Sequence, residues 1–219
     1  MTNTLHRYGS AESLDDDYVV FAIPARGLNE RDAPANQRRF LEIARKHHPL
    51  NMGDASHGAA FRPSKDLNPS VHWHREHRCD FDAVLNSVSS PTTVAAVFDD
   101  ETKVVAFLKD LKKADLGLSI NISARLDKAR ACAKSAGLQR HSVEYSLGFF
   151  GQTDRMADRN TLELSTMCGH GMVSFGLVRK LIDWIKQGRR SPEQAAATMA
   201  RFCSCGVFNT TRACRLLRK

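Results

Sequence analysis

The chain of 219 residues is long enough for one domain or two small ones with a sizeable buried core. Apolar residues make up 42% of it and charged residues 26%, which excludes a fibrous repeat and a wholly disordered chain. Since no apolar stretch reaches the ~18 residues of a membrane helix, we expect no membrane span. The polar N-terminus lacks the apolar segment of a secretory signal, so we expect a cytoplasmic protein whose six cysteines stay reduced.

The net charge of +8 originates in the last fifth of the chain. Residues 179–219 contain ten Lys and Arg against Asp183 and Glu193, whereas residues 1–178 are neutral. Such asymmetry fits an anionic ligand or cluster, an acidic protein partner, nucleic acid, or a solvated helix face. Because this region has only three aromatic residues, we do not expect a nucleic-acid partner.

Apolar runs rich in β-branched and aromatic residues predict five strands. They lie at residues 18–25, 93–98, 116–123, 142–150 and 161–166. Amphipathic stretches with capping residues predict the helices between them. These run from about 32 to 48, from Asp99 or Asp100 to about 111, and from 126 to 136. Alternating strands and helices imply crossover connections, so we predict an α/β fold with a mixed or mostly parallel sheet.

The predicted organisation has three parts. An N-terminal arm over residues 1–17 precedes an α/β body over residues 18–166, which contains a long His-rich loop at 49–90. A C-terminal helical segment over residues 167–219 carries the cysteine motifs. Its helices are predicted at 171–187, 192–202 and about 210–218.

The most informative motifs are Cys168-Gly-His170-Gly and Cys203-Ser-Cys205-Gly. Each precedes a predicted helix, where free N–H groups and the helix dipole stabilise thiolates. The segment between the motifs is predicted as a helical hairpin, whose ends return to one place. We therefore expect Cys168, Cys203 and Cys205 to meet as metal ligands, with His170 as a fourth ligand or proton donor.

The spacing favours an iron–sulfur cluster over zinc. Structural zinc sites use four closed ligands, commonly with two to four residues between paired cysteines. Here one residue separates each pair, and three thiolates would leave one iron of a 4Fe-4S cluster open. Zinc or another single metal, and roles without metal, remain the alternatives.

A second group of candidates lies on the His-rich loop, in the sequence His72-Trp-His74-Arg75-Glu-His77-Arg78. Imidazoles near their normal pKa suit proton transfer, and Arg side chains bind carboxylate or phosphate. We expect the three histidines to act as acid/base groups and the two arginines to bind substrate, although a solvated polar loop is the alternative.

His141, at the entrance of a predicted strand, is a further acid/base candidate, with a structural histidine as the alternative. Nucleotide-binding motifs are missing, so no nucleotide cofactor is predicted. We thus expect a cytoplasmic metalloenzyme whose open iron acts as a Lewis acid on a small anionic substrate, in a lyase, hydratase or sulfur-removing reaction. The alternative is a non-catalytic iron–sulfur or zinc protein: an electron-transfer subunit, a carrier or a maturation factor. Both the enzyme and the non-catalytic protein are compatible with a protein partner or a homo-oligomer.

Overall fold

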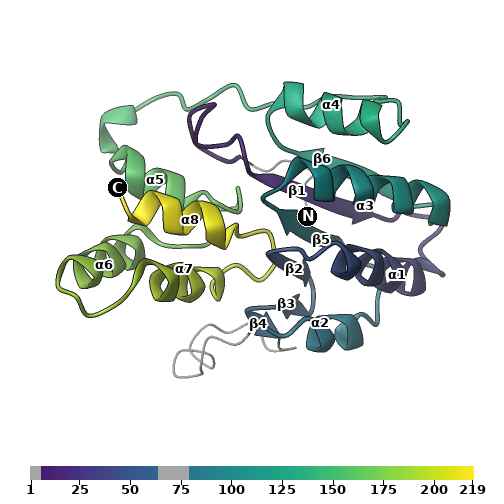
Figure 1. Cartoon of the computed structure of the whole chain (residues 1–219), viewed down its shortest axis with the longest axis horizontal. Coiled ribbons are helices and arrows are strands. Elements are labelled where there is room, and N and C mark those ends of the chain that lie inside the picture. Colours follow the sequence, from purple (N-terminus) through teal and green to yellow (C-terminus); the bar gives the residue numbers. More distant parts are fainter. Residues whose placement is uncertain (1–5, 64–78) are drawn as a thin grey trace.

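The computed structural model describes residues 6–63 and 79–219, in which helices cover both faces of a six-stranded sheet (Figure 1). The strand order across the sheet is β4-β3-β2-β5-β1-β6. In chain order the strands are β1 (Tyr18–Ile23), β2 (Asn51–Asp54), β3 (Gly58–Ala59), β4 (Arg62–Pro63), β5 (Val94–Phe98) and β6 (Ser119–Ser123).

The sheet is antiparallel throughout, so the prediction of a mixed or mostly parallel sheet is wrong. The central strand β5 pairs with β1 and β2, and β1 also pairs with β6, each time antiparallel. Crossover helices are nevertheless present, because β1 and β2 run in the same direction on either side of β5, and β5 and β6 do so on either side of β1. This interleaving of two units is the split βαβ, or ferredoxin-like, connectivity, a term that describes topology and not function.

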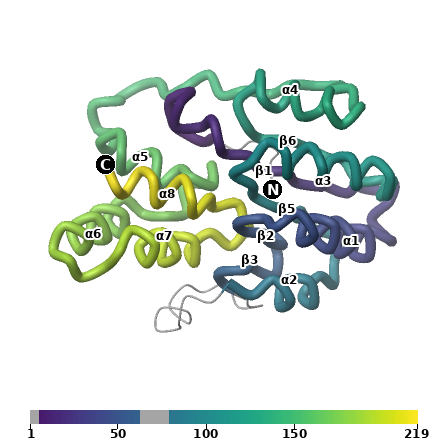
Figure 2. Tube along the Cα trace, viewed as in Figure 1, coloured from purple at the N-terminus to yellow at the C-terminus, as the bar shows by residue number. Residues whose placement is uncertain are grey.

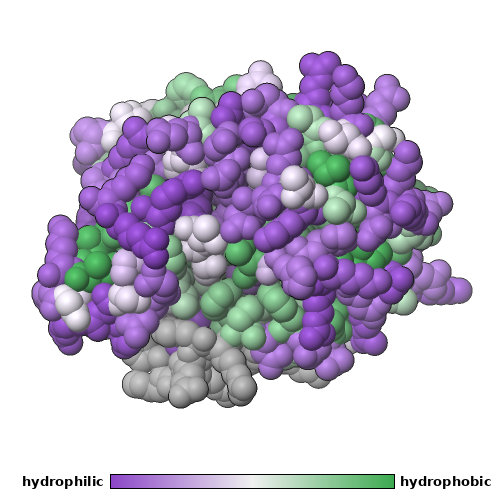
Figure 3. Space-filling view, in the orientation of Figure 1, coloured by the Kyte–Doolittle hydropathy of each residue, from purple (hydrophilic) through white to green (hydrophobic). Residues whose placement is uncertain are grey.

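Four helices cover the first face of the sheet. They are α1 (Ala33–Lys46), α2 (Phe81–Ser87), α3 (Glu101–Ala114) and α4 (Leu126–Ser135). Their apolar sides share one core with alternate residues of the strands, for example Phe40 and Phe107 with Val20 and Phe98. Hydrophilic side chains predominate on the face shown in Figure 3, as expected for helices that turn their apolar side to the sheet.

The C-terminal helices cover the second face. These are α5 (Arg159–Ser165), α6 (Phe175–Lys186), α7 (Pro192–Ala200) and α8 (Thr210–Leu217). They share a second core with the opposite residues of β1 and β5, including Val19, Phe21 and Val97. Because helices bury both faces of the sheet, β1 and β5 are continuous apolar runs. Such runs are typical of parallel sheets, which is why the sequence predicted one.

Two predicted strands are absent from the described structure. Residues 142–150 form no regular element and are exposed, with the short 3-10 helix Thr153–Arg155 following them. Residues 161–166 belong mainly to α5, which begins after Asp158, whose carboxylate accepts a hydrogen bond from the Thr161 N–H. That cap fixes a helix where the alternation of apolar and polar residues alone predicts a strand.

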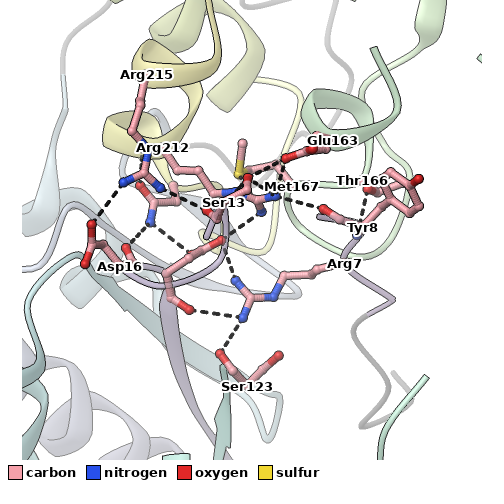
Figure 4. Close-up of polar contacts among 12 residues, drawn as sticks. Arg7, Tyr8, Ser13, Asp16, Ser123, Glu163, Thr166, Met167, Arg212 and Arg215 are labelled. Atoms are coloured by element: carbon pink, nitrogen blue, oxygen red, sulfur yellow. Dashed lines mark hydrogen bonds and ion pairs between the residues drawn. The ribbon is translucent and has the colours of Figure 1, made fainter. Parts of the chain in front are cut away.

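The described part of the N-terminal arm lies beside α5 and α8, two helices that come much later in the sequence (Figure 2). Arg212 of α8 is the centre of this contact. It donates to the backbone oxygen of Tyr8 and the hydroxyl of Ser13, and it forms ion pairs with Asp17 and Glu163 (Figure 4). The arm is therefore part of the folded body from Arg7 onward, where a second arginine also pairs with Asp17.

Candidate functional site

The predicted cysteine ligands do come together. Cys168 and His170 lie in the turn between α5 and α6, and Cys203 and Cys205 lie in the turn between α7 and α8. The Sγ atom of Cys205 is 3.6 Å from Nδ1 of His170. Cys203 lies near enough to Cys168 and Cys205, and Cys168 near enough to His170, for each pair to shift the pKa of its members. All three cysteines are buried in the core of the second face.

Two glycines hold the second cysteine turn against the sheet. Gly206 has φ +70°, and a Cβ atom there would overlap the backbone of Met52 and Gly53 in β2. Conversely, a Cβ on Gly53 would lie 2.7 Å from the backbone carbonyl of Cys205. Only glycine allows both the left-handed conformation and this close approach. The side chain of Asn51, which donates to the Phe208 oxygen at 3.2 Å, adds a second attachment between β2 and the turn.

The source of N–H groups at the site differs from the expectation. Cys168 follows the C-terminal end of α5, and the next helix starts only at Phe175. Helix N-termini therefore do not face this thiol directly. Instead, the backbone N–H groups of His170 and Met172 in the Gly-rich turn help to lower the pKa of Cys168.

The side chains of the site are strongly polarised in the absence of metal. Hydrogen bonds from the Cys203 thiol, and then from His170, lower the pKa of both Cys168 and Cys205. Interactions with the neighbouring Cys168 and Cys205, followed by burial, raise the pKa of Cys203. Hydrogen bonds to Cys168 and Cys205 raise the pKa of His170 to about 10. The arrangement thus favours two thiolates beside one thiol and one imidazolium.

One polar atom of the site has no partner. Nε2 of His170 is buried and lacks a hydrogen bond among residues 6–63 and 79–219. A buried ring nitrogen without a partner is costly, and a ligand could satisfy it. In the same described residues, however, no three His, Cys, Asp or Glu side chains are already arranged around the position of a metal ion.

The site reaches the surface through the first turn. Gly171 and Met172 are exposed, and Phe175 at the start of α6 is exposed beside them. The hydroxyl of Ser204 lies 3.8 Å from Sδ of Met172, which links the two cysteine turns at this rim. A small molecule or a partner would therefore approach over Met172.

The other predicted site residues lie elsewhere. His141 is exposed and lines a groove of about 920 Å³ beside β6 and α4, whose lining includes none of the cysteines. His72, His74, His77, Arg75 and Arg78 lie outside the described residues, so their predicted roles stay predictions. The contribution of β2 to the site was missed, although the two glycines that touch, Gly53 and Gly206, are visible in the sequence.

Comparison of the chain with protein-family models, with curated proteins and with solved structures finds no significant match. None of the helices in the described ranges has the length and apolarity needed to cross a membrane.

Proposed function

We propose that Cys168, Cys203 and Cys205 bind a metal centre, with His170 as its fourth ligand or as a proton donor beside it. The observation that carries this proposal is the meeting of three buried thiols and one imidazole from two separate turns. Soft thiolate ligands select zinc, copper(I) or iron–sulfur centres. All six cysteines of the chain are free, which is compatible with the reducing cytoplasm that we propose as its location.

The donor set fits such a centre in two respects. The unpartnered Nε2 atom of His170 would bind a metal ion once the imidazolium has lost its proton. The amides of His170 and Met172, which help to lower the pKa of Cys168, would equally stabilise a thiolate bound to metal. These amides lie on the exposed turn, so they would also be close to any molecule that reaches the metal.

Two occupants are compatible with these ligands. A 4Fe-4S cluster with one open iron requires only three thiolates, but the sulfurs would have to spread over the corners of a cube. The second occupant is a single tetrahedral ion such as zinc, which the thiolates would bind through ~2.3 Å metal–sulfur bonds. We keep the cluster as the first proposal because three thiolates would leave one of its irons open to a substrate.

When bound, an open iron or zinc supplies Lewis-acid chemistry towards a hydroxyl, carbonyl or sulfur group of a substrate. The chain contributes the approach over Met172 and a proton on His170. We therefore propose a metal-dependent enzyme of the lyase, hydratase or sulfur-removing type that acts on a small anionic substrate. The predicted His-rich loop would supply the remaining acid/base and anion-binding groups.

The second candidate is a non-catalytic protein that transfers electrons or carries its metal. The exposed apolar pair Met172 and Phe175 at the rim favours a docking partner there. The exposed charges of α6, including Arg179 and Lys180, would select an acidic partner. Such a protein would exchange its electrons or its metal with the partner but would turn over no small substrate.

Anaerobic purification followed by metal and sulfide analysis tests the proposal. A 4Fe-4S centre predicts a brown protein with a broad absorption shoulder near roughly 400 nm and about four iron and four sulfide per chain. Colourless protein with one zinc per chain would replace the cluster by the single ion. Protein that binds neither metal under reducing conditions would contradict the proposal and leave a thiol–imidazole site.

A further inference from the structure

A second constellation of reactive side chains lies on the turn between β2 and β3. Nδ1 of His57 is 2.7 Å from Oδ2 of Asp54, and Nε2 of His57 is 3.3 Å from the hydroxyl of Ser89. Exposure increases along this row: the Asp54 side chain is fully buried, that of His57 is 15% exposed, and Ser89 is exposed. A buried carboxylate, a partly buried imidazole and an accessible hydroxyl form the order of a Ser-His-Asp triad.

The local fold fixes the first two members. Asp54 ends β2, and its Oδ1 atom accepts the Ser56 N–H at 2.8 Å, which leaves Oδ2 for His57. The backbone N–H of His57 donates to the Asp54 carbonyl at 3.2 Å, which closes the tight turn. Both carboxylate oxygens are therefore occupied, and the imidazole ring has a defined position above a rigid hairpin.

The third member is brought close by two attachments between the turn and the segment that precedes β5. The Ala55 N–H donates to the Thr93 carbonyl at 3.0 Å, and the hydroxyls of Ser56 and Thr92 are 2.9 Å apart. Ser89 opens this segment directly after Val88, a buried core residue at the end of α2. The Ser89 hydroxyl therefore lies on a loop that hydrogen bonds attach to the turn, although the Ser89 side chain is exposed to solvent.

The hydrogen bonds determine which nitrogen acts as base. With Nδ1 donating its proton to the Asp54 carboxylate, Nε2 carries the lone pair and faces the Ser89 hydroxyl. This is the tautomer that a general base needs in order to accept the serine proton. The same pairing would stabilise the imidazolium that forms when the proton is transferred.

We propose that Ser89 is an activated nucleophile, that His57 is its general base, and that the site hydrolyses carboxylic esters. The Ser89 oxygen forms a bond to the ester carbonyl carbon while its proton moves to Nε2 of His57. The bond to the alcohol then breaks, and the alcohol leaves with that proton. Water attacks the acyl-serine, gives a proton to Nε2, and the acid leaves as the proton returns to Ser89, so that ester and water yield acid and alcohol.

This site is independent of the cysteine cluster. Successive residues of a strand point to opposite faces, and Gly53 faces the cysteine turn, so Asp54 lies on the face of α1 and α2. Loss of metal by the cysteine cluster would therefore leave the triad in place. Asp54 acts through His57 and is a positioning residue, whereas Ser89 and His57 would touch the substrate.

A fluorophosphonate probe tests the proposal, because it phosphonylates activated serines and releases fluoride without competing reaction at thiols. The full-length protein is labelled at neutral pH and the modified residue is located by peptide mass spectrometry. We expect one label per chain, on Ser89. Ser89→Ala should abolish it, and His57→Gln should slow it by about 100-fold, the usual scale for loss of a general base. The matched control is Ser90→Ala, on the neighbouring serine, which should label at the wild-type rate.

Asp54→Asn adds a test of the positioning role. It should slow labelling and change the shape of its dependence on pH, which a carboxylate that only stabilises the turn would leave unchanged. Thermal unfolding of each variant separates a folding defect from a chemical one, and the exposed Ser89→Ala variant should unfold like the wild type. Labelling of another residue, absence of label, or an unchanged rate at Ser89 in a folded His57→Gln variant would each overturn the proposal.

Discussion

Nη1 of Arg212 lies 3.0 Å from Oδ2 of Asp17, and both side chains are fully buried although 195 residues separate them. The same guanidinium also pairs with Glu163 and lies 3.6 Å from Sδ of Met167, the neighbour of Cys168 (Figure 4). This ion-pair network therefore connects both ends of the chain to the base of the cysteine site. Removing one partner from such a network leaves an uncompensated buried charge.

Replacing Arg212 by Met should lower the free energy of unfolding by about 3 kcal/mol or more, the scale for breaking a buried ion pair. Denaturant titration measures this change. Arg215→Met, one turn further along α8, is the matched control, because its 2.9 Å pair with Asp16 is largely exposed and such pairs contribute about 1 kcal/mol or less. Equal effects of the two substitutions would show that the buried network has no special role.

Serine substitutions separate ligand cysteines from core cysteines. Cys168→Ser, Cys203→Ser and Cys205→Ser should each abolish metal retention, because losing one of three thiolates leaves too few soft ligands. Cys132→Ser, in the core on the first face, should retain the metal and cost on the order of 1 kcal/mol for burying a hydroxyl. Metal analysis and unfolding of the same preparations check both statements. A Cys205→Ser protein with full metal content would contradict the ligand assignment.

Gly206→Ala should disrupt the second cysteine turn. The substitution combines an unfavourable backbone conformation, at φ +70°, with overlap between the new Cβ and β2. Gly188→Ala isolates the first effect, because Gly188 has φ +69° but nothing within 4 Å of its Cβ position. We expect about 1–2 kcal/mol of destabilisation for Gly188→Ala and clearly more for Gly206→Ala, which should also lose its metal. Thermal unfolding and metal analysis compare the two.

The metal-free protein should keep thiolates at neutral pH. Hydrogen bonding from Cys203 lowers the pKa of Cys168 to about 4 and that of Cys205 to about 5. Because the folded chain then binds fewer protons than the unfolded chain, this contribution to stability is complete above the ordinary thiol value near 9 and is lost as the pH falls through about 5 and 4. His170 acts in the opposite sense: its contribution is complete below 6.5 and is lost as the pH rises through its pKa of about 10.

Ultraviolet thiolate absorbance of the metal-free protein measures this ionisation. The signal should persist at pH 7 and disappear in acid, and His170→Gln should move its midpoint upward. Cys132→Ser should leave the neutral signal unchanged, because burial raises the pKa of Cys132 to about 11. A midpoint near that of an ordinary thiol in the wild type would contradict the hydrogen-bonded arrangement.

Local signals in the sequence predicted much of the fold. Ser191 followed by Pro192 correctly marked the start of α7, where the structure has a complete capping box, and Asn209 marked α8. Pairing between strands is not local. The apolar run of β1 is compatible with any sheet buried on both faces, and only the tertiary structure shows that its neighbours are antiparallel.

The approach of Cys203 to Cys168 was predictable from the sequence, because it depends on the order of the elements along the chain. The hairpin of α6 and α7 returns Cys203 to the vicinity of Cys168, as its position between the two motifs indicated. The partners of Arg212 and the contact of Gly206 with β2 join distant parts of the chain, and nothing in the local pattern identifies them. The Asp54–His57 pair is closer in sequence, but Ser89 reaches it only through the loop before β5.

Among the described residues, the helices that cover the second face of the sheet, α5–α8, follow all the strands in the sequence, so during translation the strands emerge before this cover. Val19, Phe21 and Val97 would meet water or a chaperone until α5–α8 arrive. Cys203 and Cys205 lie in the turn after α7, so they emerge later than Cys168 and later than every strand of the described sheet. The proposed metal site can therefore be completed only after the sheet and three of its covering helices, α5–α7, have been synthesised, and a truncation before α7 would remove Cys203 and Cys205 together with part of the cover of the sheet.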